Sequence, residues 1–291
     1  MIQAPPPGTL RKPDELARGD FEMVVRRLAD DLAFGADNSL FVGGGLEYAG
    51  SRPYQPGDPV RMLNWRLSAR TGKPFVKEYE ALKRTNCYIL VDTSASMAVT
   101  SQALSKHDLA VWIAAAVGLI AQRRMSPVAV VGAGARETRI EPSLSRTDLW
   151  RAVDPLRTGD LGEPTMLGVR LQRLVARVER SSVFVVVSDL HDPEDLPALK
   201  HAAQRHDCMT LHLQDPAETG ALRAGFFRGR ESETGQAFLG TSGTRWDAAD
   251  TIRRELSRCG VDYLRLLTSH SIIPPLRHFL GSRGGLLRGR G

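Results

Sequence analysis

Residues 87–97 read Cys-Tyr-Ile-Leu-Val-Asp-Thr-Ser-Ala-Ser-Met. The apolar run 88–91 stops at Asp92, and Ser94 and Ser96 follow at every second position. A short continuous apolar run of this kind is typical of a strand that is buried on both faces. The carboxyl end of this strand then carries a carboxylate and two hydroxyls, which are ligands that Mg²⁺ and Mn²⁺ accept. By itself the pattern is more often a turn or a helix cap.

A second apolar run leads to another carboxylate. Residues 183–187 read Val-Phe-Val-Val-Val, and Asp189 follows them after Ser188. Between the two runs, Glu163-Pro164-Thr165 opens an amphipathic helix predicted over 165–179. In an open α/β sheet, ligands bind beyond the carboxyl ends of the strands, where the direction of the connections reverses. If the two strands are neighbours there, five side chains converge on one cation: Asp92, Ser94, Ser96, Thr165 and Asp189.

This set of five residues resembles the metal-ion-dependent adhesion site (MIDAS) of von Willebrand factor A domains. The resemblance implies a bound Mg²⁺ or Mn²⁺. It also implies that the hydroxyls of Ser94, Ser96 and Thr165 touch the metal, while Asp92 and Asp189 act largely through water. Because neutral hydroxyls leave the charge of the cation poorly compensated, a carboxylate from a partner protein is then a favoured further ligand.

Helix and strand patterns alternate along the rest of the chain. Helices are predicted at 14–34, 106–124, 165–179, 195–206, 244–259 and 272–280, with another ending near residue 156. Strands are predicted at 127–133, 183–188, 209–214 and 262–267, with a hairpin partner at 136–141 and a hairpin within 215–243. The alternation predicts an α/β fold with a mainly parallel sheet and helices on both faces, in the Rossmann-like order of von Willebrand A domains.

The chain divides into four segments by composition. We predict an N-terminal lead-in and helix at 1–37, a Gly/Pro-rich β arm at 38–80, a von Willebrand A-like domain at 81–281 and a basic tail at 282–291. In the arm, Pro56-Gly57-Asp58 has turn chemistry, since proline fixes φ and glycine permits positive φ. We expect strands on either side of a short helix, held by Tyr54 and Trp65. A binding surface is the alternative interpretation of this arm.

The sequence pattern of the arm is similar to that of a known family. The pattern is Tyr54-x-Pro56-Gly57-Asp58-x-x-Arg61-x-x-Asn64-Trp65, followed by Ala69-Arg70 and Lys77-x-Tyr79-Glu80. Together with the Asp92 segment, it resembles DUF58, an uncharacterised bacterial family with a von Willebrand A-like domain, from about residue 38 to the final helix. Members are typically encoded beside MoxR-type AAA+ ATPases. The resemblance therefore implies a metal-dependent protein-interaction module, acting as an adaptor or assembly factor with such an ATPase or with a client protein.

Composition sets limits on class and location. The chain has 291 residues, of which 42% are hydrophobic and 25% charged, an ordinary globular composition with a net charge of +6. The amino terminus lacks the features of a signal peptide, and the longest apolar run, 109–121, is too short to span a bilayer, so we expect a cytoplasmic protein. Many family relatives carry transmembrane helices, but no such helix is expected in this sequence, so a membrane role is not carried over to it. We expect Cys87, Cys208 and Cys259 to be buried, reduced thiols.

Two other functional classes stay open. A metal-dependent hydrolase or phosphoesterase would use Asp92, Asp189 and His191, although no second ligand cluster is evident. A nucleophilic-aspartate phosphatase is disfavoured, because Ser94 stands where such enzymes place a second aspartate. Nucleic-acid binding would rest on the basic tail alone. No phosphate-binding glycine loop of the G-x-x-x-x-G-K form is present. The sequence therefore favours an interaction module over an enzyme.

Overall fold

The computed structural model describes residues 20–33, 46–81, 85–134, 137–139, 141–157, 164–218, 226–230, 237–241 and 249–286. The helices in these ranges are α1 (Phe21–Ala33), η2 (Val60–Met62), α2 (Trp65–Thr71), α3 (Ala95–Ala98), α4 (Lys106–Arg123), α5 (Arg146–Arg157), α6 (Leu167–Arg177), α7 (Asp195–Ala202), α8 (Ala249–Arg258) and α9 (Ile273–Leu286). The strands are β1 (Leu46–Pro53), β2 (Phe75–Ala81), β3 (Cys87–Val91), β4 (Val128–Ala133), β5 (Glu137–Arg139), β6 (Val183–Ser188), β7 (Asp207–Gln214), β8 (Phe226–Arg230), β9 (Ala237–Thr241) and β10 (Asp262–Leu267).

The main sheet is a six-stranded sheet in the order β10-β7-β6-β3-β4-β5. Its first five strands are parallel, and β5 pairs antiparallel with β4 at the edge. The first strand of this sheet in chain order is β3. The chain continues from β3 to its neighbour β4, and later returns to form β6, the neighbour of β3 on the opposite side. This is a Rossmann-like, doubly wound order, and the connections reverse direction between β3 and β6.

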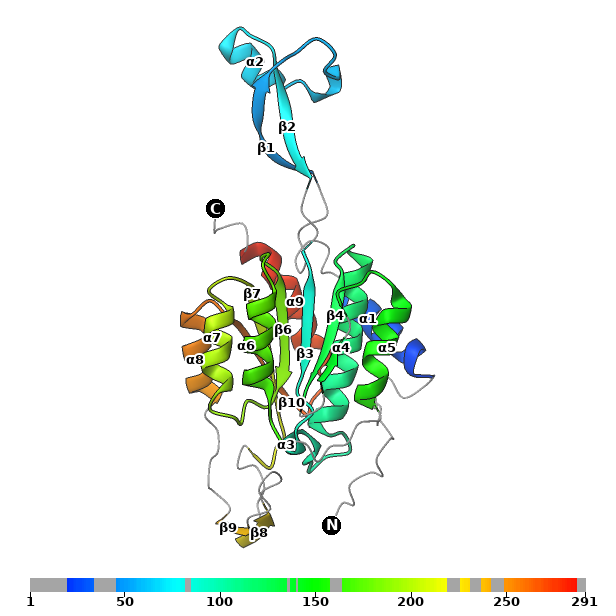
Figure 1. Cartoon of the computed structure of the whole chain (residues 1–291), viewed down its shortest axis with the longest axis vertical. Coiled ribbons are helices and arrows are strands. Elements are labelled where there is room, and N and C mark those ends of the chain that lie inside the picture. Colours follow the sequence, from blue (N-terminus) through cyan, green and yellow to red (C-terminus); the bar gives the residue numbers. More distant parts are fainter. Residues whose placement is uncertain are drawn as a thin grey trace.

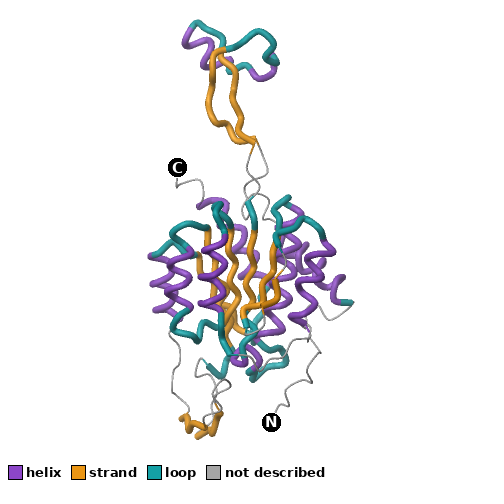
Figure 2. The backbone as a smooth tube through the Cα atoms, in the orientation of Figure 1, coloured by secondary structure: helices purple, strands orange, loops and turns teal. Residues whose placement is uncertain are grey.

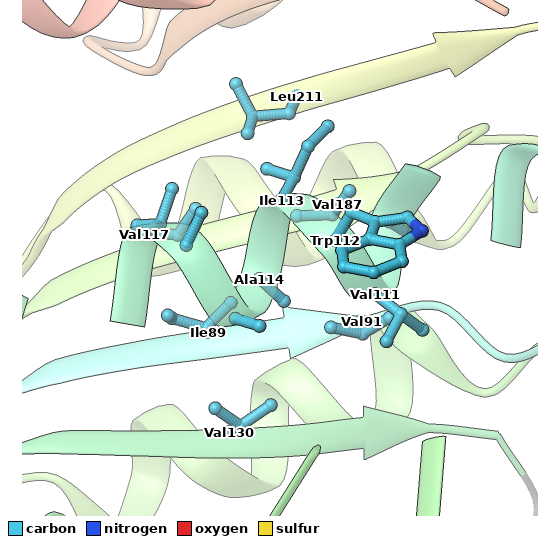
Figure 3. Close-up of a cluster of buried hydrophobic side chains, with 14 of the residues drawn as sticks. Ile89, Val91, Val111, Trp112, Ile113, Ala114, Val117, Val130, Val187 and Leu211 are labelled. Carbon is cyan, nitrogen blue, oxygen red and sulfur yellow. The ribbon is translucent and has the colours of Figure 1, made fainter. Parts of the chain in front are cut away.

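Helices cover both faces of the sheet (Figures 1 and 2). On one face, α1, α4, α5 and α9 contribute to a core in which Trp112, Ile113 and Val117 of α4 pack on β3, β4 and β6 (Figure 3). On the other face, α6 packs against β4, α7 against β7 and α8 against β10. Helix α4 is apolar on all sides and lies almost wholly in the interior, as expected for a helix of this composition. The predicted parallel α/β architecture is confirmed.

Most predicted elements are found within a few residues of their expected limits. The hairpin expected within 215–243 is present as β8 and β9, which pair antiparallel. The predicted helix at 14–34 is seen from Phe21, and residues 14–19 lie outside the described part of the chain. The last helix continues to Leu286, beyond its predicted end at residue 280. The prediction for Cys259 is wrong, because this residue is exposed after α8 while Leu256 and Val261 take the buried positions.

The arm has the predicted order of strand, short helix and strand, with β1 and β2 paired antiparallel. Asp58 accepts two hydrogen bonds of 2.7 Å from the guanidinium of Arg52, and Gly57 adopts a φ of 106° in the turn before it. Asn64 caps α2 by accepting a hydrogen bond from Leu67 N–H. Trp65 does not hold the arm in place, because it is 67% exposed. In Figure 1 the arm lies beyond the end of the sheet that is opposite α3.

Candidate metal site

The site is built where β3 and β6 end side by side. Val91 of β3 lies opposite Val187 of β6, and Asp92 N–H continues the ladder by donating to Val187 O over 2.9 Å. Both strands are fully buried. Asp92 and Asp189, the residues that follow them, are therefore held at the carboxyl edge of the sheet, at the point where the connections reverse direction. Ligands of open α/β proteins bind at this point.

The carboxylate of Asp92 is fixed by hydrogen bonds on both oxygens. Ser94 N–H donates to Oδ1 over 3.0 Å, and the hydroxyl of Ser188 donates to Oδ2 over 2.7 Å. The hydroxyl oxygens of Ser94 and Ser96 lie 3.0 Å apart, because Ser94 directly precedes α3 and Ser96 lies within it. All four side chains are buried. Three of the five predicted metal ligands thus form one connected, buried group.

Asp189, the fourth predicted ligand, is paired with a buried lysine. Lys106, the first residue of α4, places Nζ 2.7 Å from Asp189 Oδ2, and both side chains are almost fully excluded from solvent. Nζ also contacts the carboxylate of Glu218, which follows β7. A capping box between Ser105 and Asp108 fixes the start of α4 and so the position of this lysine. The other oxygen of Asp189, Oδ1, is buried and accepts no hydrogen bond in the described part of the structure.

Thr165, the fifth predicted ligand, is half-buried just before α6. The start of α6 is tied to α7 by Asp195, whose Oδ1 accepts a hydrogen bond from Gly168 N–H over 3.0 Å. Asp195 is fully buried, and its Oδ2 has no hydrogen-bond partner among the described residues. This hydrogen bond holds the start of α6, which follows Thr165, against the start of α7. Glu163 lies outside the described residues.

The electrostatics of the site reflect burial and crowding of carboxylates. Burial, together with the charge of Asp189, raises the pKa of Asp92 to about 6, although hydrogen bonds from Ser188 and Ser94 oppose the shift. Burial alone would raise the pKa of Asp189, but the Lys106 ammonium and His191 outweigh it and hold this pKa below its usual value. Burial, and then the charges of Asp92 and Asp192, raise the pKa of Asp195 to about 8.

These residues fit a divalent cation in two respects. Two hydroxyls and two carboxylates of the expected type lie together at the edge of the sheet, and Asp189 Oδ1 is a buried acceptor without a donor. A buried acceptor without a partner is costly unless a cation or a water completes it. One feature opposes the fit, because the Lys106 ammonium already neutralises Asp189 from its other oxygen.

A second possible ligand group overlaps the first. Ligand atoms of Asp189, His191 and Glu218 lie within 4.8 Å of one another, and His191 Nδ1 is 3.3 Å from Asp189 Oδ2. The Lys106 ammonium contacts two of these three residues. Sequence reasoning included His191 but missed Lys106, Glu218, Ser188 and Asp195. A lysine at the start of an otherwise apolar helix was the one available clue, since a fully buried lysine requires a carboxylate partner.

The fold and the site together define a doubly wound α/β protein with hydroxyls and carboxylates clustered at the reversal point of its sheet. The family model described as "Protein of unknown function DUF58" matches residues 50–256. The chain belongs to this family.

Relatives match nearly the whole length of the chain. The uncharacterized proteins Rv1480 of Mycobacterium tuberculosis and Mb1516 of Mycobacterium bovis are each 27% identical to it over 309 residues, covering 97% of this chain and 97% of their own. Among the helices of the described ranges, none is both long enough and apolar enough to cross a membrane.

Solved structures give only distant likenesses. The Deinococcus radiodurans RO (RSR) protein matches with a TM-score of 0.36 and 17% identity, over 69% of this chain and 35% of its own. An uncharacterized membrane spanning protein from Vibrio fischeri matches with a TM-score of 0.25 and 17% identity, over 63% of this chain and 91% of its own. Neither likeness carries a functional conclusion.

Proposed function

We propose that the chain is a von Willebrand A-like, metal-dependent protein-interaction module that acts in the cytoplasm. Support comes from one observation: the buried cluster of Asp92, Ser94 and Ser96 lies beside a carboxylate of the neighbouring strand that has an oxygen without a donor. Hydroxyls and carboxylates are the ligands that Mg²⁺ and Mn²⁺ prefer. These carboxylates and hydroxyls lie at the edge of the sheet where ligands of this fold class bind.

In the proposed site each residue has a distinct task. Ser94, Ser96 and Thr165 would offer neutral oxygens to the metal. Asp92, which is held in place by Ser188 and by Ser94 N–H, would orient water on the metal, and Asp189 would do the same from β6. The bound cation would supply positive charge that attracts a carboxylate of a partner protein. Recognition of an acidic side chain, rather than a chemical reaction, is the proposed outcome.

The proposed partner is a MoxR-type AAA+ ATPase, or a client protein that this ATPase helps to assemble. This part rests on the family resemblance carried by the arm pattern around Asn64 and Trp65. It predicts that a MoxR-type ATPase encoded near the gene is captured by the purified protein in Mg²⁺ and released by a chelator. The Asp92→Ala/Ser94→Ala double variant should fail to capture it under both conditions.

The metal itself is tested by calorimetric titration of Mg²⁺ and Mn²⁺. The wild type should bind, and the Asp92→Ala/Ser94→Ala variant should not. Ser182→Ala is a matched control, because Ser182 is a buried serine at the opposite end of β6 whose hydroxyl donates only to the local backbone, at Arg180 O. This control should bind metal as the wild type does. Equal binding by the double variant would remove the proposed site.

A metal-dependent hydrolase is the second candidate, and the group formed by Asp189, His191 and Glu218 favours it. His191 has a half-exposed side chain, so a substrate can reach it. The test is turnover of a generic phosphoester in Mn²⁺. Activity that is present in the wild type and lost in His191→Ala would favour the hydrolase over the interaction module. We expect no turnover.

A further inference from the structure

Lys106 occupies an unusual position for a lysine. Its side chain is fully buried, and it reaches the candidate site from the first residue of α4. The ammonium lies 2.7 Å from Asp189 Oδ2 and also contacts Glu218. A buried ammonium is costly to desolvate, and it persists only where carboxylates compensate its charge. The described residues meet this condition with one fully buried and one largely buried carboxylate.

The location of this positive charge matters for the metal. Asp189 is the carboxylate that β6 contributes to the proposed metal site, and Lys106 is hydrogen-bonded to it. We infer that the Lys106 ammonium is the resident cation of the site, and that it sets the metal affinity because a divalent cation must bind against its charge. This inference rests on the proposed metal site and adds a residue that controls it.

Coulomb repulsion gives the reason. A divalent cation whose bound water is held by Asp189 Oδ1 would share this carboxylate with the ammonium on Oδ2. Two positive charges at such a short separation repel each other strongly in a buried site, because the effective dielectric constant there is far below that of water. The ammonium also removes negative charge that would otherwise attract the metal. Both effects weaken metal binding in the wild type.

Glu218 gives Lys106 a second acceptor. When a metal competes for Asp189, the ammonium keeps a carboxylate partner through its contact with Glu218. Glu218 also accepts a hydrogen bond from Asp215 N–H over 3.0 Å, and Asp215 accepts one from Ser101 N–H over 2.8 Å. Metal binding is therefore coupled to the turn after β7 and to the loop that follows α3.

Two substitutions test the inference in opposite directions. Lys106→Met removes the ammonium while keeping an unbranched apolar side chain, and it should tighten Mg²⁺ binding by about tenfold or more. Glu218→Gln removes the competing carboxylate, leaves the ammonium on Asp189 and should weaken Mg²⁺ binding several-fold. The readout is the Mg²⁺ dissociation constant from calorimetry, with circular dichroism to confirm that each variant is folded.

A second readout applies if Lys106→Met is poorly stable. Loss of the ammonium leaves Asp189 without its main counter-charge, so the melting temperature should fall in chelator and rise in Mg²⁺ by more than the wild type does. Unchanged or weaker Mg²⁺ binding by folded Lys106→Met, with wild-type binding intact, would overturn the inference alone. Absence of Mg²⁺ binding in both proteins would overturn the proposed metal site as well.

Discussion

The carboxyl edge of the main sheet and the tip of the arm both carry charged residues, but these residues are buried and paired at the sheet edge and exposed at the arm tip. At the sheet edge, Lys106 and Asp189 are buried and neutralise each other. At the arm tip, Arg61, Arg66, Arg70 and Lys73 are exposed, and no ion pair is recorded for them among the described residues. A buried charge is costly to leave unpaired, whereas an exposed charge is solvated by water. The edge should therefore be sensitive to substitution and the tip tolerant of it.

The largest predicted effect is the loss of the buried ion pair. Asp189→Ala leaves the Lys106 ammonium buried with only Glu218 beside it, and we expect a loss of about 3 kcal/mol in the free energy of unfolding. Arg70→Ala, at the arm tip, is the matched control and should cost less than about 0.5 kcal/mol. Urea denaturation measures both values. Similar losses for the two variants would refute the contrast between the regions.

A smaller effect is predicted for the contact between α6 and α7. A Cβ atom added at Gly168 would lie 2.9 Å from the backbone oxygen of Glu194, which cannot move aside as a side chain does. We expect Gly168→Ala to cost about 1–3 kcal/mol and to weaken metal binding by shifting the loop that holds Thr165. Gly281→Ala in α9 is the control, because its added Cβ meets nothing within 4 Å. It should be neutral or slightly stabilising, and a neutral Gly168→Ala would count against this packing.

The pH dependence of stability separates a buried carboxyl from an exposed one. The pKa of Asp195 is raised to about 8, whereas an aspartate in an unfolded chain has a pKa of ~3.9. Between these values the folded protein holds a proton that the unfolded chain has released, so this contribution to stability is present at low pH and is lost as the pH rises to about 8. The pKa of Asp92 is raised to about 6, so its contribution to stability is also lost as the pH rises, over a narrower pH range.

Asp195→Asn mimics the protonated carboxyl and keeps an acceptor for Gly168 N–H. The wild type should lose about 2 kcal/mol more than this variant in the free energy of unfolding between pH 6 and pH 8. Denaturant titrations at the two pH values measure the difference. Asp154→Asn, at an aspartate of α5 whose side chain is 64% exposed, is the control and should keep the wild-type slope. If Asp195→Asn also keeps that slope, Asp195 does not hold the proton.

The smallest effect is predicted at the arm tip. Trp65 is 67% exposed and Val60 is 63% exposed, so each loses little contact area on truncation. We expect Trp65→Ala to change the free energy of unfolding by less than about 0.5 kcal/mol. Asn64→Ala, which removes the cap of α2, should cost about 1 kcal/mol. A larger loss in Trp65→Ala than in Asn64→Ala would mean that Trp65 has a structural contact.

The sequence predicted the sheet well because its strands are apolar on both faces. The runs at β3 and β6 admit few other structures, and their acidic ends made the adjacency of Asp92 and Asp189 a natural expectation. The arm pattern predicted the family, and the family-model match over residues 50–256 confirms it.

The contacts that could not be predicted from the sequence join residues that are far apart in the chain. Lys106 and Asp189 are separated by 83 residues, and Lys106 and Glu218 by 112. No local pattern encodes such pairs, since they follow from the packing of α4 against the ends of β6 and β7. The exposure of Trp65 and of Cys259 was missed for a related reason, because an apolar side chain near an element is buried only if a neighbour covers it.

The central claim is a divalent cation site made by Asp92, Ser94 and the neighbouring strand end. The most direct test is calorimetric titration of Mg²⁺ into the wild type, the Asp92→Ala/Ser94→Ala variant and the Ser182→Ala control. We predict saturable binding in the wild type and the control, and none in the double variant. Binding that is unchanged in the double variant, or absent at millimolar Mg²⁺ from both the wild type and folded Lys106→Met, would contradict the claim.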